Sequence, residues 1–257
     1  MPDAPRSILI SGAGSGLGRG LSLYFSHKGH RVHATDKNGA AAEETASLAG
    51  SAPGRVSAHV LDVASDAGVR DFFRTLGDEP VDVLIHNAGF QHVARLEEFP
   101  QEVWDELVGV ILKGACLLTR AVLPPMRLRG FGRIIHIGSI HSLVASPYKT
   151  AYVAAKHAIL GFAKTVALET AEADISVNTI CPSYIHTPLV DAQIKSQAAA
   201  HGISPQAVID QIMLRPMPKR RFVTCEEVAA TAEFLMSHAA RNITGQAIAI
   251  DGGWTIQ

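Results

Sequence analysis

The stretch Ser7-Ile-Leu-Ile10-Ser11-Gly12-Ala-Gly14-Ser15-Gly16-Leu17-Gly18 decides the fold of this chain. Its first four residues form an apolar run that fits a buried strand, and a helical pattern starts at Leu17 and continues through Leu21 and Phe25. Glycines between a strand and a helix allow a sharp turn and a close approach to a pyrophosphate, whose charge the unpaired N–H groups of the helix can bind. Because a strand precedes the loop and a helix follows it, we predict a nucleotide-binding turn rather than a flexible surface turn.

The next predicted strand, Arg31–Thr35, ends at Asp36, about 20 residues after the glycine loop, as the dinucleotide-binding pattern expects. A carboxylate at this place can accept hydrogen bonds from both ribose hydroxyls and would repel a 2′-phosphate. We therefore predict NAD rather than NADP as the cofactor. A solvated aspartate at a strand end is the alternative, and the neighbouring Lys37 leaves NADP open.

Short strand-like runs alternate with helical stretches along the chain. The predicted strands are Ser7–Ile10, Arg31–Thr35, Val56–Leu61, Val81–His86, Arg133–Gly138, Ser176–Ile180 and Ala247–Ile250. The two longest helical patterns are Gln101–Leu128 and Thr150–Ala171. This alternation predicts an α/β fold, with a parallel sheet covered by helices on both faces. Ligands of such sheets bind beyond the carboxyl ends of the strands, so one crevice is expected to collect Gly12, Asp36, Asn87, Ser139 and Pro182.

Length and composition narrow the class of protein. A chain of 257 residues without a linker, charge block or internal repeat favours a single domain, residues 1–257. Its hydrophobic content of 47% suits a well-filled core, and its net charge of −1 gives no reason to expect nucleic acid or a membrane as partner. No uninterrupted apolar stretch reaches the roughly 18 residues of a membrane span, and the first residues lack a signal-peptide pattern. Cys116, Cys181 and Cys225 are isolated and lack metal-ligand spacing, so we expect a cytoplasmic protein with reduced thiols and no catalytic metal.

Ser139, Tyr152 and Lys156 are the candidate catalytic residues. Residues four apart on a helix share a face, so Tyr152 and Lys156 point the same way. An ammonium beside a phenol favours the phenolate, and we expect Lys156 to lower the pKa of Tyr152 from its usual value of about 10. Ser139 follows an apolar run and can donate a hydrogen bond to the same substrate oxygen. A lone Tyr-x-x-x-Lys would fit an ordinary amphipathic helix, but here it accompanies the glycine loop and Asp36.

With these motifs the chain resembles the short-chain dehydrogenase/reductases over essentially its whole length. The matching segments are Ser11–Gly18, Asp62-Val63, Asn87-Ala88-Gly89, Ser139, Tyr152 with Lys156, Cys181-Pro182 and Asp251-Gly252-Gly253. The resemblance implies a single Rossmann-type domain with a doubly wound, seven-stranded parallel sheet, in a homotetramer. It also implies that NAD is bound by Gly12, Ser15, Gly16, Leu17, Gly18, Asp36, Asp62, Val63, Asn87, Ala88, Gly89, Tyr152, Lys156, Pro182, Ile185 and Thr187.

A closer resemblance is to the bacterial D-3-hydroxybutyrate dehydrogenases, enzymes of ketone body metabolism. It rests on the segments 90–93, 141–157, 187–190, 221–224 and 251–254. The resemblance implies that a small carboxylate substrate is bound by Gln91, His141, Lys149 and Gln193, besides Ser139 and Tyr152. A carboxylate that enters a partly dry pocket needs charge-assisted donors to replace its lost water. Singly, each of the four fits a surface or loop role, but as a set they favour a carboxylate site.

Two positions depart from the family pattern. Ile111 stands where the family usually carries an asparagine that helps to hold a water of the proton relay, and an isoleucine side chain cannot form a hydrogen bond. Either the backbone carbonyl near residue 111 holds the water and the enzyme is active, which we favour, or the relay fails. Ser183 replaces a common glycine.

Three further expectations concern other parts of the chain. His86 and His136 are expected to make hydrogen bonds in the core. Residues 187–218 are expected to form two short helices of a substrate lid that is disordered or open without ligand and brings Gln193 to the substrate on closing. The alternatives to a 3-hydroxybutyrate dehydrogenase are a dehydrogenase for another hydroxy acid or a 3-oxoacyl substrate, and a catalytically weak NAD-binding regulator.

Overall fold

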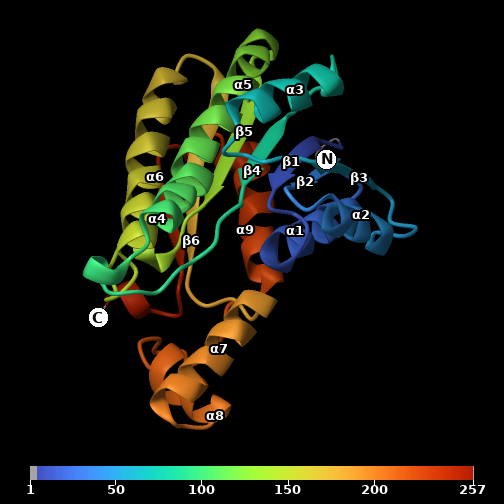
Figure 1. The fold of residues 1–257 in the computed structure, drawn as a ribbon. Coiled ribbons are helices and arrows are strands. Elements are labelled where there is room, and N and C mark those ends of the chain that lie inside the picture. Colours follow the sequence, from blue (N-terminus) through green and yellow to red (C-terminus); the bar gives the residue numbers. More distant parts are fainter. Residues whose placement is uncertain (1–4, 257) are drawn as a thin grey trace.

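The computed structural model describes residues 5–256, apart from the side chains of Pro188, Leu189, Ser196, Ala200 and His201. Its strands form one parallel sheet in the order β3-β2-β1-β4-β5-β6-β7 (Figure 1). This confirms the predicted seven-stranded doubly wound sheet. The strands are β1 Ser7–Ser11, β2 Arg31–Asp36, β3 Arg55–Val60, β4 Val83–His86, β5 Phe131–Ile137, β6 Asp174–Pro182 and β7 Ala247–Ile250.

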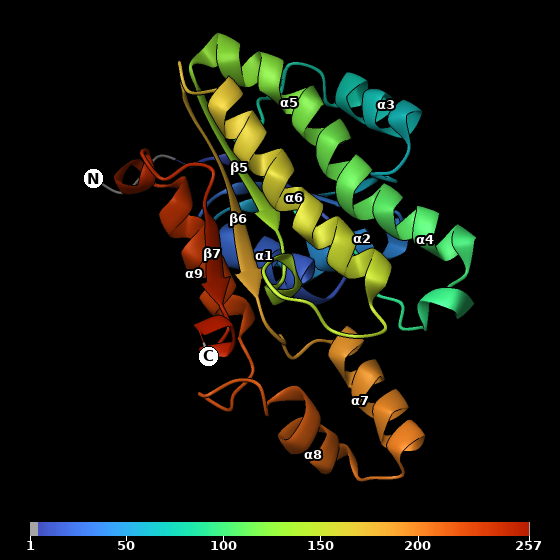
Figure 2. The same ribbon diagram turned by 90° about the vertical axis from the view of Figure 1, so that its left-hand side faces the viewer.

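Two layers of helices cover the two faces of the sheet (Figure 2). Because side chains alternate along a strand, Ile8 and Ile10 of β1 pack on one face and Leu9 packs on the other. The first face is covered by α1 Gly16–His27, α2 Gly39–Leu48 and α9 Cys225–Met236, and the second by α3 Asp66–Leu76, α4 Gln101–Val108, α5 Gly114–Arg129 and α6 Thr150–Glu169. Short 3₁₀ turns lie at Leu96–Glu98, Ile140–Ser142, His238–Ala240 and Trp254–Ile256.

The expected helix Gln101–Leu128 is interrupted by a π turn, Gly109–Lys113, between α4 and α5. A π turn adds one residue to a single turn, and the apolar periodicity around it does not reveal the insertion. By length and mean hydropathy, 1.7 over its most apolar window, Gln101–Arg129 is also suited to cross a membrane, which the sequence did not lead us to expect. However, 44% of that window is buried inside the protein, and the helix packs on β5 and α6 as a core helix does.

A helical segment extends from the carboxyl edge of the sheet (Figure 1). It contains α7 Pro188–His201, α8 Pro205–Val208 and a π turn at Ile209–Met213. Gly202, at φ +61°, ends α7 in the left-handed conformation that glycine adopts without strain. The two short helices expected in residues 187–218 are therefore present, beside the edge at which β1, β2, β4, β5 and β6 end.

Candidate active site

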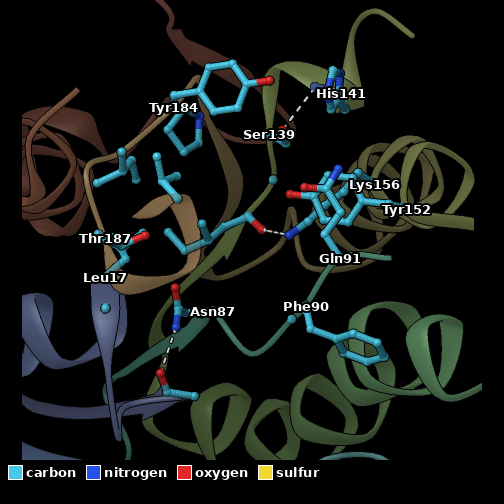
Figure 3. A pocket seen from close by; sticks show the side chains of 18 of the residues that line it. Leu17, Asn87, Phe90, Gln91, Ser139, His141, Tyr152, Lys156, Tyr184 and Thr187 are labelled. Atoms are coloured by element: carbon cyan, nitrogen blue, oxygen red, sulfur yellow. Dashed lines mark hydrogen bonds between the residues drawn. The ribbon is translucent and has the colours of Figure 1, made fainter. Parts of the chain in front are cut away.

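A cavity of about 360 Å³ lies at the carboxyl ends of the strands (Figure 3). It runs from the glycine loop to the Ser139, Tyr152 and Lys156 group, and the five strand-end residues expected in one crevice all line it. The other predicted site residues that line it are Ser15, Gly16, Leu17, Ala88, Gly89, Gln91, His141, Lys149, Ile185, Thr187 and Gln193. The sequence therefore located most of the wall of one continuous cavity.

The glycine loop has the close packing that a phosphate-binding turn requires. Gly12 has φ +64°, and a Cβ atom there would lie 2.8 Å from Ala88 Cα. A Cβ at Gly18 would lie 2.1 Å from the carbonyl oxygen of Gly12. Among the described residues, no side chain caps the first N–H groups of α1, although Ser15 occupies the N-cap position. These N–H groups are therefore available to the pyrophosphate of a dinucleotide, so the loop fits NAD or NADP.

Asp36 is held firmly at the end of β2. Its Oδ2 accepts a hydrogen bond from Gly14 N and its Oδ1 accepts one from Asn38 N, both at 2.9 Å. The neighbouring Lys37 donates to Glu106 Oε1 on α4 at 3.2 Å. The carboxylate thus stays beside the glycine loop, where a ribose would lie, while the ammonium is paired elsewhere.

Three predicted cofactor residues lie outside the cavity lining. Gly18 is buried beneath Gly12. Asp62 is exposed and accepts a hydrogen bond from Ala64 N at 2.9 Å. Val63 is buried against α5, where a Cβ at Gly114 would approach its Cγ2 to 2.9 Å. Gly18 thus lies directly under a residue of the cavity wall, whereas Asp62 and Val63 do not line the cavity in this structure.

Asn87 connects the loop after β4 to the glycine loop. Its Nδ2 donates to the carbonyl oxygens of Ser11 and Gly12, both at 3.0 Å. In return, Ser11 Oγ accepts hydrogen bonds from the backbone N–H groups of Asn87 and Ala88 at 3.1 Å. These bonds hold two neighbouring strand ends in a fixed relation (Figure 3).

Ser139, Tyr152 and Lys156 converge on the cavity from β5 and α6 (Figure 3). Ser139 Oγ accepts a hydrogen bond from His141 N at 3.1 Å, while Ser142 Oγ accepts one from Ser139 N at 3.2 Å. Lys156 Nζ donates to the carbonyl oxygen of Ile137 at 2.6 Å. A serine hydroxyl can donate one hydrogen bond while it accepts others, so Ser139 can accept from His141 N and still donate its proton.

Burial governs the pKa values of the two helix residues. It raises the pKa of Tyr152 to about 12, against the smaller lowering effect of a hydrogen bond with Ser139, and it lowers the pKa of Lys156 to about 8. The prediction that Lys156 lowers the pKa of Tyr152 is therefore wrong for this arrangement. Lys156 Nζ lies 5.6 Å from the centre of the Tyr152 ring, and the desolvation of the phenol outweighs any effect of that charge.

The four predicted carboxylate ligands lie together at the outer end of the cavity. Lys149 Nζ is 3.5 Å from His141 Nε2, and Gln193 Nε2 of α7 donates to Gln91 Oε1 at 2.8 Å. Burial lowers the pKa of His141 to about 4 and also lowers the pKa of Lys149. Among the described residues, Gln91 Nε2 is buried without an acceptor, as a donor to a missing anion would be. The Gln193 contact also brings α7 against Gln91 in the cavity wall. The expected opening of residues 187–218 without ligand stays a prediction.

Two aromatic residues complete this end of the site, although the sequence did not assign them to it. The Tyr184 ring lies 5.7 Å from Lys149 Nζ and lines the cavity. The Trp254 ring lies behind it, 5.9 Å from the Tyr184 ring and 6.1 Å from the His141 ring. Trp254 closes one of the motifs of the resemblance, but only the pairing of β6 with β7 brings it here.

Although the Ile111 side chain is apolar, the backbone of this residue forms a hydrogen bond in the core. Its side chain is fully buried in the π turn, and its carbonyl oxygen accepts a hydrogen bond from His86 Nε2 at 3.0 Å. His86 thus makes the core hydrogen bonds expected of it. The same expectation is wrong for His136, because within residues 5–256 neither of its buried ring nitrogens has a partner.

The chain is similar to known proteins over its whole length. A family model described as enoyl-(acyl carrier protein) reductase matches residues 12–255. D-beta-hydroxybutyrate dehydrogenases of Rhizobium meliloti and Cupriavidus necator are 41% and 39% identical to it, over 98% of this chain and 99% and 98% of their own lengths. A 3-oxoacyl-(acyl-carrier-protein) reductase of Thermotoga maritima is 32% identical over 96% of this chain and 97% of that protein. A solved structure from Beutenbergia cavernae, described as an NAD(P)-dependent gluconate 5-dehydrogenase with NADP bound, has a TM-score of 0.89 and 32% identity, and the match covers 99% of this chain and 98% of that one.

Proposed function

The chain belongs to the short-chain dehydrogenase/reductase family, and from this premise we propose that it is an NAD-dependent enzyme that reversibly oxidises D-3-hydroxybutyrate, or a closely related small 3-hydroxy carboxylate, to the 3-keto acid. The observation that carries the proposal is the cavity itself. Its inner wall holds Ser139, Tyr152 and Lys156, and its outer end holds Lys149 among uncharged donors. A small hydroxy acid has a secondary alcohol and a carboxylate that match these two ends.

NAD rather than NADP is proposed because of Asp36. A 2′-phosphate beside this carboxylate would add a like charge, and Lys37, the nearest basic residue in the sequence, is paired with Glu106. The ribose hydroxyls of NAD would instead find an acceptor that Gly14 N and Asn38 N already hold in place. When bound, NAD supplies the acceptor for the hydride of the alcohol carbon.

The residues of this chain would act on the alcohol oxygen and its proton. Ser139 donates a hydrogen bond to that oxygen, and Tyr152 exchanges the hydroxyl proton. Lys156, with a pKa of about 8, carries a positive charge at neutral pH. That charge favours the Tyr152 phenolate, which burial disfavours and which takes up the hydroxyl proton when the alcohol is oxidised. Gln91, His141, Lys149 and Gln193 would hold the carboxylate, and the lid formed by residues 187–218 would exclude water.

Initial rates test the proposal. NAD and NADP are each tried with D- and L-3-hydroxybutyrate, with longer and branched hydroxy acids, and in reverse with a 3-oxoacyl thioester. The proposal expects the highest kcat/KM for NAD with D-3-hydroxybutyrate. A preference for NADPH and the thioester would assign the chain to 3-oxoacyl reduction, and NADH binding without turnover of any substrate would make it a regulator. The homotetramer, the cytoplasmic location and the part in ketone body metabolism stay predictions, of which light scattering on the purified protein checks the first.

A further inference from the structure

A continuous hydrogen-bonded path leads from the glycine loop to the π turn beside the catalytic helix. It starts at Ser11 Oγ, which lies 3.0 Å from His86 Nδ1, and it continues from His86 Nε2 to the carbonyl oxygen of Ile111. His86 is 1% exposed. The path therefore crosses the core directly behind the active site.

The direction of these bonds follows from the groups themselves. Ser11 Oγ accepts the N–H groups of Asn87 and Ala88, so its own proton goes to His86 Nδ1. A neutral imidazole that accepts at Nδ1 carries its proton at Nε2, where it donates to Ile111. Burial lowers the pKa of His86 to about 4, so this neutral tautomer is present at neutral pH.

The Ile111 carbonyl matters because of what the Ile111 side chain touches. Ile111 packs with Ala151 and Ala155 of α6, and Tyr152 packs against the same cluster. On its other side, a Cβ at Gly89 in the cavity wall would lie 3.4 Å from Ile111 Cγ1. A displacement of the π turn would therefore reach the Tyr152 face of α6 through close-packed side chains.

We propose that His86 is a positioning residue for proton transfer, which holds the π turn through the Ile111 carbonyl oxygen and thereby fixes Tyr152 relative to Ser139. This inference rests on the proposed function. It assigns to a histidine of β4 a task that the apolar Ile111 side chain cannot perform. Loss of the Nε2 bond is expected to lower kcat about 10- to 100-fold, the order of effect that small misplacements of reacting groups produce.

Two substitutions of His86 by residues with side-chain amides test its two hydrogen bonds one at a time. An asparagine amide reaches the place of Nδ1, and a glutamine amide reaches the place of Nε2. His86→Asn therefore keeps the partner of Ser11 and loses the bond to Ile111, whereas His86→Gln keeps a donor to Ile111. His136→Leu is the matched control, since His136 is the register partner of His86 on β5, is equally buried, and has no hydrogen bond at either ring nitrogen within the described residues.

The variants are compared by kcat and KM for NAD with D-3-hydroxybutyrate, by the Kd of NADH, and by hydrogen exchange of residues 107–115 and 150–158 without substrate. We expect His86→Asn to lower kcat with little change in KM or in the Kd of NADH, and to speed exchange in both segments. His86→Gln is expected to restore both readouts, and His136→Leu to leave both near those of the unmodified protein.

The outcomes distinguish a failure of the positioning role of His86 from a failure of the proposed function. Equal kcat losses in His86→Asn and His136→Leu would show that any change to a buried imidazole has this effect, and would overturn the inference. Equal kcat in His86→Asn and the unmodified protein would overturn it as well. If the unmodified protein oxidises no hydroxy acid, the proposed function fails. The role of His86 in holding the π turn is then tested separately, because unchanged hydrogen exchange of residues 107–115 in His86→Asn would refute it.

Discussion

Replacing Lys156 by methionine should stabilise the fold at neutral pH while it destroys activity. Lys156 is 4% exposed, and burial moves its pKa from 10.5 to about 8. Because of this change in pKa, the buried ammonium destabilises the folded protein by about 3 kcal/mol at pH 7. The variant also leaves the Ile137 carbonyl oxygen without its donor, which costs about 1–3 kcal/mol. We expect a net gain of about 1 kcal/mol at pH 7.

The pH dependence of this gain is the sharper test. Between pH 8 and pH 10.5 the unfolded chain keeps the lysine proton and the folded protein has lost it. The stability contributed by this position therefore rises with pH in the unmodified protein. From pH 7 to pH 10 the advantage of Lys156→Met should fall by about 2 kcal/mol, and near pH 10 the variant should become the less stable of the two.

Urea unfolding of both proteins at pH 7, 8, 9 and 10 gives the difference directly. Groups that do not interact with Lys156 cancel between the two proteins. The buried Cys181 does interact with it, since burial raises the pKa of this thiol and the Lys156 charge lowers it. Lys164→Met is the control, since Lys164 is an exposed lysine further along the same helix. A difference in the free energy of unfolding that stays constant or widens as the pH rises would refute the reasoning. An equal pH trend in the Lys164→Met control would refute it too.

Three other substitutions test separate parts of the site. Tyr152→Phe should lower kcat by at least about 100-fold and leave the Kd of NADH unchanged; an equal loss of NADH binding would point to misfolding instead. Lys149→Met should raise KM for 3-hydroxybutyrate by about 10- to 100-fold, with Lys149→Arg nearer to the unmodified protein, and an equal rise for an uncharged secondary alcohol would remove Lys149 from carboxylate binding. Tyr148→Asn should raise the free energy of unfolding by about 1 kcal/mol, because Tyr148 has φ +66° and is half exposed, and calorimetry that shows no rise in Tm would contradict the assigned strain.

The sheet could be predicted because its signals are local. Each predicted strand overlaps an observed one, since apolar runs such as Ile8–Ile10 are bounded by glycine or polar residues that end them. The interrupted helix shows the limit of this reasoning. The π turn begins at Gly109 and is followed by Gly114, but the apolar positions around it keep helical spacing, so the sequence pattern cannot distinguish a π turn from a continuous α-helix.

The site could be predicted in its composition but not in its electrostatics. Spacing places Tyr152 and Lys156 on one helix face, and both do line the cavity. It does not show how deeply the phenol is buried, nor that the ammonium is bonded to Ile137 on β5. Burial is the largest cause of the raised Tyr152 pKa, and burial comes from packing between segments far apart in the sequence.

Ile111 is a second position whose surroundings could not be predicted from the sequence. From the sequence alone, the residue is a missing hydrogen-bonding group, and the activity of the chain depends on whether a backbone carbonyl can take over. The structure places His86, 25 residues earlier in the chain, against that carbonyl. His86 therefore holds the π turn through its backbone, but it does not replace a side-chain amide that helps to hold the relay water. A comparison of family motifs at position 111 alone cannot reveal the bond between His86 and Ile111, because that bond joins the end of a strand to a helix that only the fold brings together. The case for activity therefore depends on the second lone pair of the Ile111 carbonyl oxygen, which can still accept a hydrogen bond from a water while the His86 bond keeps the π turn in place.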